Sequence, residues 1–223
     1  MFSWLHSDND HRTVSGALSD LYAVKSAACF AAIMLIALAK ARAHHPFRRF
    51  GPANQVTAIR ALLVALVAGC IGEVPGAGVA TVAVAAAAMA TALDGADGWL
   101  ARRTGMTSAY GARFDMEVDA LLIQVLAVLA WQWQKAGAWI LLAGLMRYLF
   151  VIAGRFWAWM RRPLRPTFRG KAICIVQVVS LIVAVMPDVQ PPASGVVAAV
   201  GLSALGYSFF VDSCWLWTAR EQA

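Results

Sequence analysis

Residues 93–122 read LDGADGWLARRTGMTSAYGARFDMEVDALL and lie between two long apolar segments. This stretch contains four aspartates, which are Asp94, Asp97, Asp115 and Asp119. An ionised carboxylate in or beside a bilayer costs several kcal/mol unless it is paired or bound to a metal. Packing alone therefore does not account for four of them, and we interpret the stretch as a divalent-metal site at a membrane surface.

The composition is typical of a membrane protein, because 61% of the 223 residues are hydrophobic and only 14% are charged. A soluble domain is about half apolar and about a quarter charged. Several stretches approach the roughly 20 apolar residues that a helix needs to cross a bilayer. The short alternating segments of a membrane β-barrel are absent from the sequence. We therefore expect an all-α, polytopic integral membrane protein.

The apolar segments predict seven membrane-spanning helices. They cover residues 18–39, 55–73, 77–100, 114–134, 138–159, 171–187 and 193–217. The first segment contains Lys25, which would snorkel toward the lipid headgroups if the segment spans the membrane; an interfacial helix is the alternative. We expect residues 1–44 to form an N-terminal segment with this extra helix, and residues 45–223 to form one domain with the other six.

The net charge of +7 does not indicate a nucleic-acid partner, because the basic residues lie in short loops between the apolar spans. The loops after the first, third and fifth spans contain Lys40, Arg42, Arg48, Arg49, Arg102, Arg103, Arg113, Arg161, Arg162, Arg165, Arg169 and Lys171. The positive-inside rule places these loops in the cytoplasm, together with the C-terminus and the acidic stretch. The N-terminus is then outside, or inside if the first helix is interfacial.

The four aspartates form two pairs with helical spacing. Asp94 and Asp97 are three residues apart, and Asp115 and Asp119 are four apart, so each pair shares one helix face. The segment between the pairs, RRTGMTSAYG, is short and rich in turn residues. We therefore expect two adjacent, antiparallel helices whose four carboxylates converge near the cytoplasmic interface.

Converging carboxylates repel one another, and two divalent cations would neutralise them. A cluster with only oxygen ligands and no His or Cys favours Mg²⁺, Mn²⁺ or Ca²⁺ over zinc. Two such cations are a common arrangement for phosphoryl transfer. Gly95, Gly98 and Gly111 would let a diphosphate approach the backbone closely, and Arg102 would hold a phosphate.

The acidic stretch has the spacing Asp94-x2-Asp97-Gly98-x2-Ala101-Arg102-x8-Gly111-x3-Asp115-x3-Asp119, with eight fixed positions in 26 residues. A shorter motif, Asn54-x2-Thr57-x2-Arg60, lies upstream. The first spacing resembles the full signature of the CDP-alcohol phosphotransferase (CDP-alcohol phosphatidyltransferase) family, and the second resembles the motif that opens its first core helix. The six spans from about residue 55 onward also resemble the six-helix core of that family, and the first span is an addition to it. The resemblance covers roughly residues 45–217.

This resemblance implies an enzyme of phospholipid biosynthesis, in which a CDP-linked donor such as CDP-diacylglycerol transfers its phosphatidyl group to an acceptor alcohol and CMP leaves. It implies two divalent cations, Mg²⁺ or Mn²⁺, held by Asp94, Asp97 and Asp115, with Asp119 as the general base and a further ligand. It implies that the CDP portion contacts Asn54, Thr57, Gly98, Ala101, Arg102 and Gly111. It also implies a homodimer, which we expect in the inner (cytoplasmic) membrane of a bacterium with the active site facing the cytoplasm.

Three basic residues outside the signature indicate what kind of acceptor the protein would bind. Arg147 and Arg155 are eight residues apart and share a helix face, and Lys171 lies at the entrance of the next helix. Together they would bind a phosphorylated acceptor such as glycerol 3-phosphate or an inositol phosphate. Alternatively, Arg60 and Arg147 pair with the acidic cluster, Arg155 snorkels, and the acceptor is neutral, such as inositol, serine or choline. We expect Glu117 to point away from the site and to pair with a loop arginine.

Two other classes of membrane protein compete with the enzyme hypothesis. A divalent-cation transporter also needs intramembrane carboxylates, but near the midplane of the bilayer and in both halves of its spans. In this sequence they cluster at one face. A seven-helix receptor has no need for four carboxylates in one cytoplasmic hairpin.

Overall fold

The computed structural model describes residues 18–44, 51–104, 108–161 and 167–220 of the chain. These residues form seven α-helices and two short 3-10 helices, and they contain no strand. The elements are α1 (Asp20–His44), α2 (Pro52–Gly69), α3 (Ala77–Thr104), α4 (Ala109–Gln132), η1 (Ala138–Leu141), α5 (Leu142–Phe156), η2 (Ala158–Arg161), α6 (Phe168–Val185) and α7 (Ala193–Arg220). The prediction of an all-α fold is confirmed.

The described helices are those of a polytopic membrane protein. Six of them, α1, α2, α3, α5 (with η1), α6 and α7, are long and apolar enough to cross a bilayer. The sequence predicted seven spans. The difference is α4, whose first half contains Arg113, Asp115, Glu117 and Asp119. The charges that mark the candidate site are therefore also the reason why α4 does not qualify by composition.

The helices α2, α4 and α6 begin earlier than the apolar pattern predicted, and the first two have clear start signals. The second helix was predicted from residue 55 but starts at Pro52, where a proline suits the first turn because it lacks the N–H that has no partner there. The fourth was predicted from residue 114 but starts at Ala109. Ser108 caps it, because its Oγ accepts a hydrogen bond from the backbone N–H of Gly111 at 3.0 Å. The first turn of α4, AYGA, has no run of strongly apolar residues, so hydrophobicity alone did not include it.

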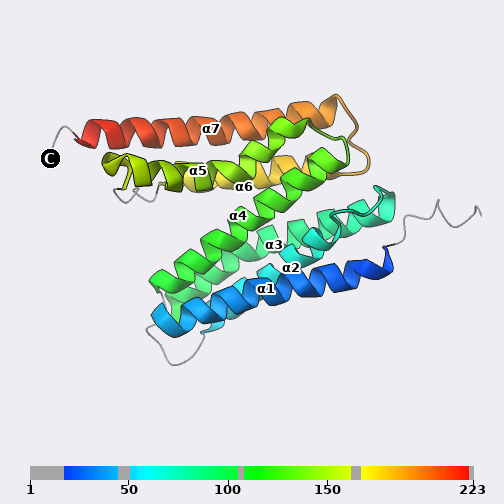
Figure 1. The fold of residues 1–223 in the computed structure, drawn as a ribbon, viewed down its shortest axis with the longest axis horizontal. Coiled ribbons are helices and arrows are strands. Elements are labelled where there is room, and N and C mark those ends of the chain that lie inside the picture. The colour runs from blue at the N-terminus through cyan, green and yellow to red at the C-terminus, as the bar shows by residue number, and fades with distance from the viewer. Residues whose placement is uncertain (1–17, 45–50, 105–107, 162–166, 221–223) are drawn as a thin grey trace, which may run out of the picture.

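The helices form two groups joined by α4, as Figure 1 shows. In one group, α2 packs along both α1 and α3, and in the other, α6 packs along α7. α4 runs obliquely and contacts α2, α5 and α6. We predicted that α3 and α4 are adjacent and antiparallel. In the described residues α2 contacts both helices, and α3 and α4 make at most a slight direct contact.

Small residues explain why α2 takes this position. Ala83, Ala87 and Ala90 lie on one face of α3 and are at most 1% exposed. They pack in the same core as Ala61 and Val64 of α2. In a membrane the hydrophobic effect does not drive helices together, so close packing matters more, and small side chains let helix backbones approach closely. The tight contact between α2 and α3 places one face of α2 beside the acidic end of α3.

The first helix is present as predicted, and its lysine has partners within the protein. Lys25 forms an ion pair with Glu73 in the loop between α2 and α3, and its Nζ also donates to the carbonyl oxygen of Ile71 at 2.9 Å. Because Glu73 is itself only 5% exposed, both charges are satisfied inside the protein. The apolar pattern of the first span could not show this partner, which lies 48 residues away.

Candidate active site

Three aspartates of the acidic stretch meet at one point. Asp94 comes from α3, and Asp115 and Asp119 come from α4, on the same face and one turn apart. One carboxylate oxygen of each lies within 4.8 Å of the others. Their side chains are 36%, 32% and 27% exposed, so all three can be reached from solvent. The predicted convergence of these three carboxylates is confirmed.

A buried arginine from α2 occupies the centre of this cluster. The Arg60 side chain is 1% exposed, and its Nη2 lies 2.8 Å from the Asp94 carboxylate. It also forms ion pairs with Asp115 and Asp119, and its Nε donates to the carbonyl oxygen of Ala90 at 3.1 Å. A buried guanidinium needs such partners, because an unpaired charge in this position is costly. Arg60 therefore joins three helices at the site, in agreement with the alternative that it pairs with the acidic cluster.

The donor set suits a hard divalent cation. All three groups offer carboxylate oxygens, which Mg²⁺, Mn²⁺ and Ca²⁺ prefer. Three carboxylates and one guanidinium leave two net negative charges, which one divalent cation would balance. The cluster is thus preorganised by Arg60 without being neutralised by it.

Part of the predicted signature lies where the structure gives no side-chain description. α3 continues to Thr104, so the positions of Asp97, Gly98, Ala101 and Arg102 are helical. Their side chains and surroundings lie outside the described part of the protein. Their roles as ligands or CDP contacts stay predictions.

The upstream motif faces the start of α4. Asn54 and Thr57 of α2 are 7% and 2% exposed and precede Arg60 by six and three residues. A Cβ atom added to Gly111 would stand 2.9 Å from Oδ1 of Asn54, which is too close for an unchanged packing. Gly111 therefore permits the close approach of α2 and α4 next to the carboxylates.

A cavity of about 830 Å³ adjoins the acidic cluster between α4, α5, α6 and α7. Asp119 lines it, whereas Asp94 and Asp115 do not. Arg147 and Arg155 of α5 line it as well, as predicted from their shared helix face. Asp119 is thus the member of the triad that faces both the candidate metal centre and the cavity.

Glu117 and Lys171, near the predicted acceptor site, do not lie where we predicted. Arg147 Nη2 donates to Glu117 at 2.7 Å, so Glu117 pairs with a helix arginine and not with a loop arginine. The reason is that α5 packs against α4 and brings Arg147 beside it. Arg147 does not join the aspartate cluster in the described structure. Lys171 is exposed on α6 and does not line the cavity, although its neighbour Gly170 does.

Sequence reasoning missed one polar wall of this cavity. Asp212 of α7 lines it and forms an ion pair with Arg169 of α6. Ser208, four residues before Asp212 on the same helix face, also lines it and is 6% exposed. A carboxylate inside the last apolar span is an unusual feature that could have indicated this wall.

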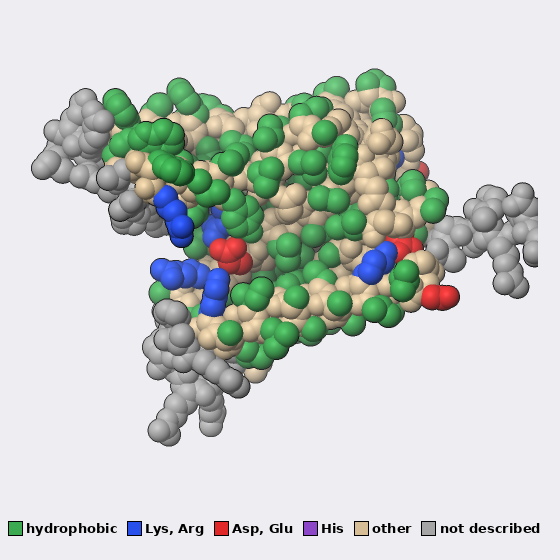
Figure 2. Space-filling model, in the orientation of Figure 1, with side chains coloured by type: hydrophobic (Ala, Val, Ile, Leu, Met, Phe, Trp, Pro, Cys, Tyr) green, Lys and Arg blue, Asp and Glu red, His purple; other side chains and the backbone are tan. Residues whose placement is uncertain are grey.

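Acidic and basic side chains lie close together at one end of the molecule. Figure 2 shows an acidic patch recessed among basic side chains at the end where α1 finishes and α4 begins. An anionic ligand that approaches this end meets positive charge first, and a cation bound by the carboxylates would add to that attraction.

Comparison with known proteins agrees with the site. The family model of CDP-alcohol phosphatidyltransferase matches residues 50–209, which include α2 to α6 and most of α7. Neither a curated protein nor a solved structure shows significant similarity to the chain. The matched region contains the aspartate triad, Arg60 and all the described residues that line the cavity except Asp212.

Proposed function

The chain belongs to the CDP-alcohol phosphatidyltransferase family, and we propose that it transfers the phosphatidyl group of CDP-diacylglycerol to a small acceptor alcohol, with release of CMP, in phospholipid biosynthesis. The observation that carries this proposal is the triad of Asp94, Asp115 and Asp119 beside a large cavity. A divalent-cation site next to a space for an acceptor is what phosphoryl transfer to an alcohol requires.

We propose that the site binds two divalent cations, Mg²⁺ or Mn²⁺, through Asp94, Asp97, Asp115 and Asp119. When bound, these ions would withdraw charge from the diphosphate and favour departure of CMP. Four carboxylates, Arg60, two divalent cations and a doubly charged diphosphate sum to one net negative charge. This near balance supports two ions over one, because a single ion would leave three negative charges in a partly buried site.

Asp119 is the proposed general base. It is the triad member that also lines the cavity, so it can reach a hydroxyl group bound there. The acceptor oxygen forms a bond to the β-phosphorus of the donor, and the bond from that phosphorus to the bridging oxygen breaks. CMP leaves with the bridging oxygen, and the hydroxyl proton passes to the Asp119 carboxylate.

We propose that the CDP portion lies between the ends of α2, α3 and α4. The buried Asn54 and the closely packed Gly111 support this, because they form one wall beside the carboxylates. Thr57 belongs to the same wall. The contacts assigned to Gly98, Ala101 and Arg102 rest on the family resemblance.

The proposed acceptor carries a phosphate, as glycerol 3-phosphate and inositol phosphates do. Arg147 and Arg155 support this, since both line the cavity that Asp119 faces. Arg147 is partly engaged by Glu117, but its Nε is buried and makes no hydrogen bond in the described structure. A phosphate would satisfy that donor. Lys171 is proposed to contribute from the entrance of α6, outside the cavity wall.

The proposed setting is the inner membrane of a bacterium, with the active site and C-terminus in the cytoplasm, and a homodimer as the assembly. The basic loops near the site support the orientation by the positive-inside rule. We propose residues 45–223 as the catalytic domain and residues 1–44 as an N-terminal segment that contains α1.

A head-group screen tests this function. Purified protein receives CDP-diacylglycerol, Mg²⁺ or Mn²⁺ and one acceptor at a time, and CMP release is recorded. We expect release with a phosphorylated acceptor and its loss in Asp119→Asn. The matched control is Asp188→Asn, an equivalent change in the loop between α6 and α7, which should release CMP at the wild-type rate. Cation flux into vesicles without any CMP release would favour a transporter instead.

A further inference from the structure

The helix that precedes the family match is fastened to the catalytic helix at both ends. α1 ends at His44, before the matched region begins at residue 50. It packs along α2 and also contacts α4, which supplies Asp115 and Asp119. An accessory helix that only anchored the chain in lipid would not need polar contacts with the helix of the active site.

The first attachment lies beside the candidate active site. The hydroxyl of Tyr110 donates to the carbonyl oxygen of Ala37 in α1 at 2.8 Å, and both residues are about 5% exposed. The Tyr110 ring stacks on Phe114, one turn along α4, with centroids 6.2 Å apart. Tyr110 and Phe114 directly precede Gly111 and Asp115 in the chain. The face of α4 that carries Tyr110 and Phe114 therefore adjoins the face that carries Gly111 and Asp115.

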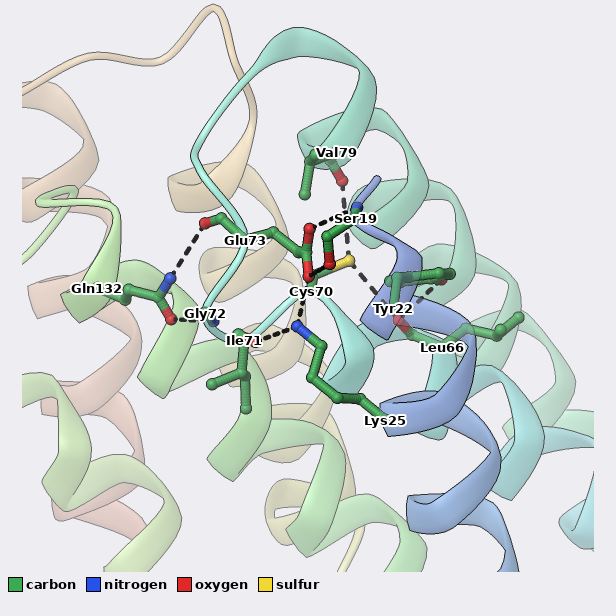
Figure 3. A network of polar contacts seen from close by, with 10 residues as sticks. All are labelled: Ser19, Tyr22, Lys25, Leu66, Cys70, Ile71, Gly72, Glu73, Val79 and Gln132. Atoms are coloured by element: carbon green, nitrogen blue, oxygen red, sulfur yellow. Dashed lines mark hydrogen bonds and ion pairs between the residues drawn. The ribbon is translucent and has the colours of Figure 1, made fainter. Parts of the chain in front are cut away.

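The second attachment lies at the opposite end of α1 and is shown in Figure 3. The carboxylate of Glu73 pairs with Lys25 and accepts hydrogen bonds from the backbone N–H and hydroxyl of Ser19, at 2.8 and 2.7 Å. Gln132, at the end of α4, accepts from the N–H of Gly72 at 2.9 Å and donates to the carbonyl oxygen of Glu73 at 3.2 Å. The loop between α2 and α3 thus links the start of α1 to the end of α4.

Close packing along α2 holds α1 between these two attachments. The Tyr22 hydroxyl donates to the carbonyl oxygen of Leu66 at 3.1 Å. A Cβ atom added to Gly69 would stand 2.1 Å from Oγ of Ser26, so only glycine permits this approach of α1. α1 is therefore in a defined register against α2, which supplies Asn54 and Arg60 to the site.

We propose that α1 holds the first turns of α4 in register with α2, and that Tyr110 is the positioning residue through which it acts. A rotation of α4 by one residue would turn Asp115 and Asp119 by about 100° away from Arg60. Much smaller displacements matter, since misplacing reacting groups by about 1 Å can cost about a hundredfold in rate. The catalytic consequence rests on the proposed function, but the structural consequence does not.

The test compares two variants of the full chain. Tyr110→Phe removes one hydroxyl and leaves no buried acceptor without a partner, because the Ala37 carbonyl oxygen still accepts a hydrogen bond within the α1 helix. Lys25→Met breaks the attachment at the far end of α1, about 18 Å along the helix from Ala37. Hydrogen exchange of residues 109–115, and kcat and KM for CMP release, are measured for both and for wild type.

For Tyr110→Phe we expect exchange of residues 109–115 to rise by up to about tenfold, because the hydrogen bond to the Ala37 carbonyl is lost. We also expect kcat to fall by about tenfold, with KM for the acceptor changed by less than about twofold. Lys25→Met should raise exchange near residues 70–76 and leave both kcat and the exchange of residues 109–115 as in wild type.

Unchanged exchange of residues 109–115 in Tyr110→Phe would overturn the role of α1 in holding α4. Raised exchange with an unchanged kcat would overturn the catalytic role of Tyr110, as would an equal loss of kcat in Lys25→Met. Absence of CMP release from wild type would count against the proposed function alone, and the exchange data would still decide whether α1 supports α4.

Discussion

Replacing Arg60 by methionine tests how the acidic cluster is held together. Methionine keeps an unbranched apolar stem but removes the guanidinium that contacts Asp94, Asp115 and Asp119. Three carboxylates within 4.8 Å would then face one another without a counter-charge in the absence of metal. The folded state should lose stability, because the unfolded chain leaves these carboxylates in water and far apart.

The magnitude follows from the burial of the partners. Removing one member of a buried ion pair costs about 3–5 kcal/mol. The three carboxylates are 27% to 36% exposed, so solvent screens part of their repulsion. We therefore expect a loss of about 2–3 kcal/mol in EDTA. For a chain of this size, each kcal/mol lowers Tm by about 2–4 °C, which gives a shift of about 4–12 °C.

Divalent metal should reverse much of this loss. Saturating Mn²⁺ at about 100 times its Kd stabilises a protein by about 2.7 kcal/mol. Without Arg60 the cluster has one more negative charge, so Mn²⁺ should raise the Tm of the variant by more than it raises that of wild type. The assay is thermal unfolding of detergent-solubilised protein in EDTA and in a Mn²⁺ titration.

Arg147→Met is the control, because it breaks the ion pair with Glu117, whose members are 31% and 46% exposed. Exposed pairs contribute about 0–1 kcal/mol, so its Tm in EDTA should fall by less than about 4 °C. If the Tm of Arg60→Met in EDTA falls no further than that of the control, Arg60 does not stabilise the carboxylate cluster as we infer. An identical Mn²⁺ response in variant and wild type would refute the charge balance that we assign to the cluster.

Three further outcomes are expected from the site and from the outer end of α1. Gly111→Ala places a Cβ atom 2.9 Å from Oδ1 of Asn54, and this overpacking should cost about 1–3 kcal/mol and raise KM for CDP-diacylglycerol in the CMP assay. Arg155→Met, which alters the cavity wall, should raise KM for a phosphorylated acceptor by about tenfold, and a KM equal to that of wild type would contradict the proposed pocket. Lys171→Met, outside that wall, should raise it less. The hydrogen bonds that the Glu73 carboxylate accepts from Lys25 and from the backbone and hydroxyl of Ser19 lower the pKa of Glu73 from 4.5 to about 2, so its contribution to stability is present above pH 4.5 and is lost as pH falls toward 2. The difference in unfolding free energy between wild type and Glu73→Gln should shrink across this window, and a difference independent of pH would contradict it.

The sequence predicted those features that depend on a local pattern, such as an apolar segment or the spacing of residues within one helix. Six of the seven apolar segments form helices that are long and apolar enough to cross a membrane. The spacing of Asp115 and Asp119 places both on one helix face. Their convergence with Asp94 followed because three carboxylates near a bilayer need a common partner. The positions of Arg147 and Arg155 on one cavity wall followed in the same way from a spacing of eight residues.

The sequence was uninformative where the outcome depended on which helices pack together. The small residues of α3 predicted close packing but not its partner, so the insertion of α2 beside both acidic helices was missed. The pairing of Glu117 with Arg147 depends on the contact between α4 and α5, and that of Lys25 with Glu73 depends on where the second loop folds. Such contacts between distant segments leave no periodic pattern in the chain.

The most direct measurement is anomalous diffraction from crystals grown with saturating Mn²⁺, recorded at the manganese absorption edge. We expect two anomalous peaks per chain, each within coordination distance of carboxylate oxygens from α3 and α4, and their loss in Asp115→Asn. Wild-type crystals with Asp94, Asp115 and Asp119 well ordered and no anomalous peak between them would contradict the metal centre on which the proposed reaction depends.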